Sequence, residues 1–178
     1  MGYEHSLLTS GESILEYLAR GRFATEHKDN YTYGQKFVDD ATPLNGTAAE
    51  RVRVKFSQYK TGTFDYDAES RRYLAGQYGA DYVDGDTGER VAATNLLVLE
   101  TNISVIPGDS YGRMKVRTTG EGEGSYFCGG KSIPIRWSRA SRNSPFAYTT
   151  QGGVPLNLER GNSYVCVISP KTGSVEVS

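Results

Sequence analysis

Residues 120–145, GEGEGSYFCGGKSIPIRWSRASRNSP, constrain the fold more than any other stretch, and they hold the only tryptophan of the chain. Gly129 and Gly130 can adopt the positive φ angles of a tight turn, and short segments of alternating apolar and polar residues lie on either side. This pattern predicts a β-hairpin whose second strand has an apolar and a polar face. The apolar face would hold Ile133, Ile135 and Trp137, and the polar face Ser132, Pro134, Arg136 and Ser138. We therefore expect a sheet with one buried face and one basic, hydroxyl-rich face.

Further segments with strand character follow one another from residue 51 onward. In residues 51–55 two valines alternate with arginine and lysine, which predicts a half-buried, edge-type strand. Residues 95–105, NLLVLETNISV, are the longest apolar stretch and predict either a central strand buried on both faces or a long bent one. Other strands are expected within residues 64–73, 113–117 (with Met114 and Val116 pointing inward), 146–149, 154–158 and 164–168. This spacing predicts a mostly β fold, an antiparallel sandwich or open barrel with one short N-terminal helix.

The helix is expected at about residues 10–20. Thr9 and Glu12 have the T-x-x-E spacing of a capping box, apolar residues follow at helical spacing, and Gly21 can end the helix. Residues 22–50 are polar and rich in turn-forming residues, and we expect them to form an extended connector. The composition changes near residue 51, where the strands begin.

The bulk properties of the 178 residues exclude several classes of protein. A net charge of −1 argues against duplex nucleic acid as a partner, which favours strongly basic domains. No apolar run reaches the roughly 18 residues needed to span a bilayer, so we expect a soluble chain. Cys128 and Cys166 are too few for a disulfide framework or a structural zinc site, and we expect two ordinary thiols.

Candidate catalytic and ligand-binding patterns are weak. His5 and His27 are the only histidines and precede the strands, which disfavours Ser-His or Cys-His catalysis there. The acidic run around Asp84 and Asp86 fits a β-turn better than a calcium loop. The glycines at positions 120, 122 and 124 lack the context of a phosphate-binding loop and suggest a flexible strand connection. We therefore expect no metal, no cofactor and no identifiable catalytic residue, although a carboxylate pair for glycoside hydrolysis stays open.

The basic cluster of the hairpin is the best candidate for binding. Guanidinium groups beside hydroxyl groups and aromatic rings can hold phosphate or carboxylate groups through paired hydrogen bonds. The alternative is a solvated strand face and a loop that Trp137 anchors in the core. The candidate binding residues are Tyr126, Lys131, Arg136, Trp137, Arg139 and Arg142.

Three segments of the chain lie in register with one another as in a known family. They are EHSLLTSGE at residues 4–12, FDYDAESRRYLAGQYGADYVDGDTGERVAATNLLVL at residues 64–99, and the hairpin at residues 120–145. Together they resemble the YerB-like family of bacterial lipoproteins, a domain of unknown function. The resemblance implies that residues 1–40 are the tail of a preceding α/β domain together with a connector, and that residues 41–178 are a β-rich C-terminal domain. It also implies an extracytoplasmic protein held at the membrane by a lipid anchor that this chain lacks. It implies no activity, because the family has no assigned catalytic residues.

We therefore expect a non-enzymatic, extracytoplasmic binding or interaction module of a cell-envelope lipoprotein, which contacts an anionic wall polymer or a partner protein. The face with Arg136, Arg139 and Arg142 is the expected contact, and we expect neither nucleic acid nor direct membrane binding. The alternative is an enzyme that acts on wall glycan or peptide through a carboxylate pair. A further alternative is a homo-oligomer formed through the apolar residues of the N-terminal segment, Leu7, Leu8, Ile14, Leu15 and Leu18.

Overall fold

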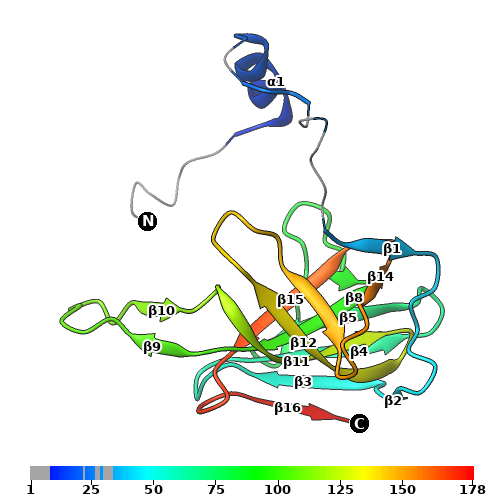
Figure 1. The fold of residues 1–178 in the computed structure, drawn as a ribbon. Helices are drawn as coiled ribbons and strands as arrows, with labels where there is room; N and C mark the ends of the chain where they lie inside the picture. The colour runs from blue at the N-terminus through cyan, green and yellow to red at the C-terminus, as the bar shows by residue number, and fades with distance from the viewer. Residues whose placement is uncertain (1–8, 22, 27–28, 30–33) are drawn as a thin grey trace. The chain divides into compact units, whose positions relative to one another are not determined.

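The computed structural model describes residues 9–21, 23–26, 29 and 34–178 and divides into two compact units, Met1–Thr32 and Tyr33–Ser178 (Figure 1). The first unit contains α1 (Gly11–Ala19), close to the expected bounds. Its N-cap is Ser10 instead of the expected Thr9, because the Ser10 side chain accepts a hydrogen bond from the backbone N–H of Ser13. Gly21 follows α1 with a φ of 73°. His5, Leu7, Leu8 and His27 lie outside the described residues.

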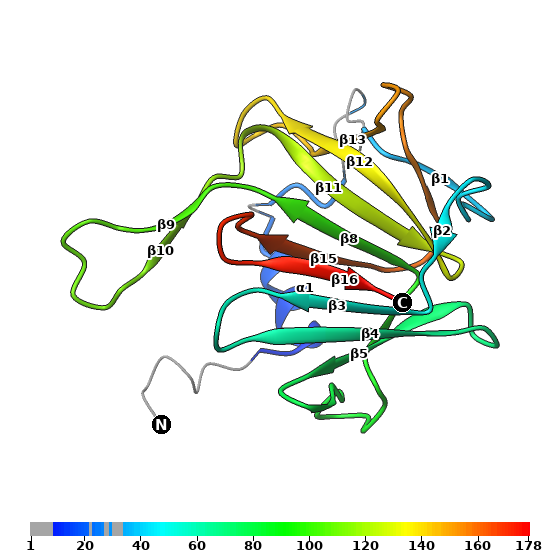
Figure 2. The same cartoon turned by 90° about the horizontal axis from the view of Figure 1, so that it is seen from below.

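The second unit is mostly β, as expected, and contains two six-stranded sheets (Figures 1 and 2). The first sheet has the order β13 (Ala147–Thr150), β12 (Lys131–Arg139), β11 (Gly120–Cys128), β8 (Asn95–Glu100) and β15 (Ser163–Ile168), with β2 (Thr47–Ala48) also paired to β12. The second has the order β16 (Ser174–Val177), β3 (Arg51–Lys55), β4 (Thr61–Asp67), β5 (Arg72–Gln77) and β6 (Ala80–Asp81), with β7 (Ala92–Ala93) also paired to β5. Neighbouring strands are antiparallel except β15, which runs parallel to β8.

Two shorter pairs complete the described strands. β1 (Lys36–Val38) lies parallel to β14 (Asn157–Glu159), and β9 (Ile103–Val105) lies antiparallel to β10 (Met114–Val116). The sheets stay open and none closes into a barrel among the described residues. No helix in the described part of the chain has the length and hydropathy to cross a bilayer.

The core has two layers, one on each face of β8. Leu96 and Val98 belong to a cluster that also contains Val52, Phe64 and Tyr73 of the second sheet, so the two sheets pack face to face there. Leu97 and Leu99 belong to a cluster on the opposite face, which contains the following residues: Tyr126, Cys128, Ile135, Trp137, Leu156 and Leu158. β8 is therefore a central strand buried on both faces, one of the two alternatives predicted for residues 95–105, and the end of that stretch forms β9 in another sheet.

Three predictions about the strands were wrong. β3 is no edge strand, because β16 and β4 pair with it on its two sides. Met114 and Val116 are exposed, because β10 pairs with β9 in a two-stranded sheet outside the core. The glycines at positions 120, 122 and 124 belong to β11 and not to a connection between strands.

The extended connector expected at residues 22–50 contains two short strands, β1 and β2.

Candidate functional site

The β11–β12 hairpin has the predicted turn. Gly129 and Gly130 adopt φ angles of 57° and 72°, and Cys128 pairs with Lys131 across the turn. A Cβ atom on Gly129 would collide with Thr42, and one on Gly130 would meet the ring of Tyr66 at 2.8 Å. The two glycines thus supply both the turn conformation and the space for close packing.

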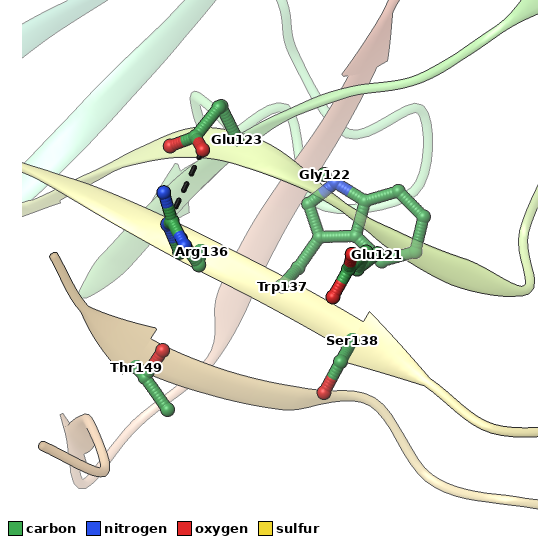
Figure 3. A pocket seen from close by; sticks show the side chains of 7 residues that line it. All are labelled: Glu121, Gly122, Glu123, Arg136, Trp137, Ser138 and Thr149. Carbon is green, nitrogen blue, oxygen red and sulfur yellow. Dashed lines mark ion pairs between the residues drawn. The ribbon is translucent and has the colours of Figure 1, made fainter. Parts of the chain in front are cut away.

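An open hollow of about 410 Å³ lies on the face of β11, β12 and β13 (Figure 3). It is lined by Glu121, Gly122, Glu123, Arg136, Trp137, Ser138 and Thr149. Arg136 has Glu123 as its cross-strand partner on β11 and Thr149 as its partner on β13. The side chains of Glu123 and Phe127 lie on the same face of β11, and Phe127 packs between the two sheets. The hollow is therefore a continuation of the inter-sheet face, at the end where this face is open to solvent.

The hollow is lined by one cationic side chain, Arg136, and two carboxylates, Glu121 and Glu123. The Arg136 Nε atom lies 3.3 Å from the Glu123 Oε1 atom, and Arg136 also donates a hydrogen bond to Gln151. Gln151 in turn donates to the second Glu123 oxygen over 2.7 Å. Both charged side chains are more than half exposed, at 62% and 54%, so the pair stabilises the fold by about 0–1 kcal/mol. The ion pair itself therefore holds Arg136 only weakly.

Two of the predicted binding residues, Trp137 and Tyr126, are buried and make contacts within the fold. Trp137 is 2% exposed, and its indole N–H donates a hydrogen bond of 3.0 Å to the Glu100 carbonyl. Gly122, its cross-strand partner, leaves room for the indole, since a Cβ atom there would lie 2.6 Å from the indole nitrogen. Tyr126 is fully buried, and its hydroxyl donates to the Asn95 side chain over 2.7 Å.

The other predicted binding residues do not gather at the hollow. Arg139 donates to the backbone carbonyls of Ser144 and Arg142, and its guanidinium lies 5.0 Å from the Phe146 ring centroid. Arg139 therefore orders the loop after β12. Arg142 lies exposed in that loop, and Lys131 lies at the opposite end of β12. Of the six predicted residues, only Arg136 and Trp137 line the hollow.

A polar cluster that the sequence analysis missed lies beside a second hollow of about 660 Å³. The buried carboxylate of Glu159 accepts hydrogen bonds from the Cys128 thiol at 3.2 Å and from the backbone N–H of Ala41. Arg71 joins Glu159 and Asp40, at 3.4 and 3.0 Å respectively, and has an unusual φ of 57°. No sequence pattern could reveal this cluster, because its members come from four separate segments.

The chemistry of this second cluster favours a structural role. A hydrogen bond from the Thr42 hydroxyl is the main cause that lowers the pKa of Asp40, and the Glu159 charge raises the pKa of Arg71. Burial raises the pKa of the Cys128 thiol to about 12. The thiol therefore stays protonated at neutral pH and is a poor nucleophile.

The acidic run after β6 forms the expected turn. The Asp84 carboxylate accepts hydrogen bonds from the backbone N–H groups of Asp86 and Thr87, which lower its pKa. Cys128 and Cys166 are both free and buried, in the two different core clusters, as two ordinary thiols should be.

A family model described as "Protein of unknown function (DUF3048) C-terminal domain" matches residues 52–165. The chain belongs to this family. The resemblance expected from the sequence is thereby confirmed, and the match covers β4, β5, β8 and the β11–β12 hairpin.

The fold is similar to that of the crystal structure of YerB protein from Bacillus subtilis, with a TM-score of 0.73 and 20% sequence identity. The similarity covers 94% of this chain and 54% of the YerB chain, so this chain spans about half of that protein's length. At this identity the similarity shows a shared fold. The search of curated proteins finds no match.

Proposed function

We propose that the chain is a non-enzymatic binding module of an extracytoplasmic envelope lipoprotein, and that the hollow around Arg136 binds an anionic wall polymer. The carrying observation is an arginine on an open sheet face, held by a weak ion pair to Glu123 and flanked by the hydroxyls of Ser138 and Thr149. Residues 41–178 would form the binding domain, and residues 1–40 the end of a preceding domain. The membership of the DUF3048 family is compatible with this proposal and assigns no activity.

The geometry of the hollow suits an extended polar ligand. Three adjacent strands place Glu123, Arg136 and Thr149 in one row across the sheet. A phosphate or carboxylate group on the polymer would replace Glu123 as the partner of the Arg136 guanidinium, through paired hydrogen bonds. Neighbouring hydroxyl groups of the polymer would then contact Glu121 and Ser138, which are cross-strand partners.

The test is a pull-down on isolated cell-wall sacculi, with and without their anionic polymers, over a salt series. We expect binding that requires the polymers, weakens with salt and is lost in Arg136→Ala. Arg53→Ala is the matched control, because Arg53 also forms an exposed cross-strand ion pair, with Glu176 at 3.1 Å. Equal binding of the Arg136→Ala variant, or no binding to either preparation, would refute the proposal.

One observation favours a second candidate function, an enzyme that acts on wall glycan through a pair of carboxylates. Glu121 and Glu123 are two residues apart on β11 and both line the hollow, so their Cα atoms are about 7 Å apart. Carboxyl groups of glycoside hydrolases lie about 5–9.5 Å apart. Both glutamates are exposed, however, whereas a general acid needs burial to raise its pKa. Release of reducing ends from purified wall glycan, abolished by Glu121→Gln and by Glu123→Gln, would replace the binding proposal with this one.

A further inference from the structure

The β9–β10 pair forms an arm that projects beyond the two sheets in both views (Figures 1 and 2). Its cross-strand register places the apolar residues of the two strands on one face, where Val105 pairs with Met114 and Ile103 pairs with Val116. Val105, Met114 and Val116 are 55%, 52% and 40% exposed. The arm therefore presents an apolar face to solvent.

The opposite face of the arm is polar and basic. Ser104 pairs with Lys115 there, and a shallow hollow of about 300 Å³ on this face is lined by Asn102, Ser104, Lys115 and Arg117. Residues 101–119 carry three cationic side chains (Arg113, Lys115 and Arg117) and one carboxylate (Asp109), a net charge of +2, whereas the whole chain has a net charge of −1. Positive charge is thus concentrated on the element that exposes the apolar face.

The tip of the arm is held in one conformation. The Asp109 carboxylate accepts hydrogen bonds from the backbone N–H and the guanidinium of Arg113, at 2.8–3.0 Å. The Arg113 guanidinium lies 5.4 Å from the ring centroid of Tyr111, which is 84% exposed. An ordered tip lowers the entropy lost on binding, and an exposed tyrosine is typical of residues at a membrane–water interface.

We propose that the β9–β10 arm binds the surface of an anionic phospholipid bilayer. The apolar face enters the boundary between headgroups and acyl chains, and Lys115 and Arg117 on the opposite face contact the lipid phosphates, as basic residues do in interfacial amphipathic elements. Charge disfavours arm-to-arm contact between two copies of the chain, because two arms of net charge +2 repel each other. The contact is direct and independent of any lipid anchor, which departs from the expectation, made from the sequence, that the chain does not bind a membrane directly.

The test is flotation with phosphatidylcholine vesicles that contain or lack phosphatidylglycerol, at low and high salt. We expect the chain to float only with the anionic vesicles and less at high salt. Val105→Ser combined with Met114→Ser should weaken binding at least about tenfold, and Lys115→Glu should do the same. These side chains are exposed, so the variants should keep the fluorescence of the buried Trp137.

Two controls match these changes. Leu44→Ser combined with Val154→Ser removes two exposed aliphatic side chains outside the arm, and Lys55→Glu makes the same charge change on β3. Both should bind as the parent does. Failure to float with anionic vesicles, or unchanged binding of the arm variants, overturns the proposal. Concentration-dependent association that Val105→Ser/Met114→Ser abolishes, without vesicle binding, assigns the arm to a second copy instead.

Discussion

Asn95, the first residue of β8, should be the most sensitive polar position in the core. It is fully buried, and its side-chain oxygen accepts hydrogen bonds from the Tyr126 hydroxyl at 2.7 Å and the Glu159 backbone N–H at 2.9 Å. Its side-chain nitrogen donates to the Glu159 carbonyl over 2.8 Å. One side chain thus joins β8, β11 and β14.

Asn95→Ala leaves three buried groups without this partner: the Tyr126 hydroxyl, the Glu159 backbone N–H and the Glu159 carbonyl. An unsatisfied buried group costs about 1–3 kcal/mol, and a water molecule that enters the vacated space would recover part of this. We expect a loss of about 3–5 kcal/mol in the free energy of unfolding. Tyr126→Phe removes only the hydroxyl, and Asn95 keeps its bond to the Glu159 N–H, so this change should cost about 1 kcal/mol.

Urea unfolding followed by the fluorescence of Trp137 measures both losses, because this single tryptophan is buried in the same core cluster as Tyr126. In the double variant the Tyr126 hydroxyl is no longer left unsatisfied, so the double loss should fall short of the sum by about 1–2 kcal/mol. A cost below about 1.5 kcal/mol for Asn95→Ala, or additive losses, would refute this account of the core.

Three further predictions concern the hairpin turn and the thiols. Gly129→Ala should cost about 2 kcal/mol more than Gly153→Ala in urea unfolding, because both positions have positive φ but only Gly129 packs against Thr42; equal costs would contradict the packing argument. Burial raises the pKa of both Cys128 and Cys166 to about 12, so at pH 8 neither thiol should react with a disulfide reagent until denaturant unfolds the chain, and a fast reaction of the native protein would contradict their burial. The thiols of the unfolded chain ionise above about pH 9, whereas those of the folded chain stay protonated up to about pH 12. The free energy of unfolding should therefore be unaffected by these thiols below about pH 9 and should fall as the pH rises toward 12. Urea unfolding at each pH measures this fall, which should be smaller in Cys166→Ala.

The candidate site was predictable only in part. Alternation in residues 133–137 correctly placed Arg136 on the exposed face of β12 and Trp137 on the buried one. It could not show that Arg139 bonds to the carbonyls of its own loop, because that contact depends on the path of the chain after β12. The exposure of Met114 was also missed, since an apolar alternation looks the same in a core strand and in a projecting arm.

The sequence by itself determined the features that local physics controls. The paired glycines specify the β11–β12 turn through their positive φ angles, and the continuous apolar run of β8 favours a strand in the interior. Only the tertiary structure decided that β15 pairs parallel to β8 and that Arg71, Cys128 and Glu159 meet in one cluster. These contacts join segments far apart in the chain, and their register depends on how whole sheets pack, which no local period in the sequence encodes.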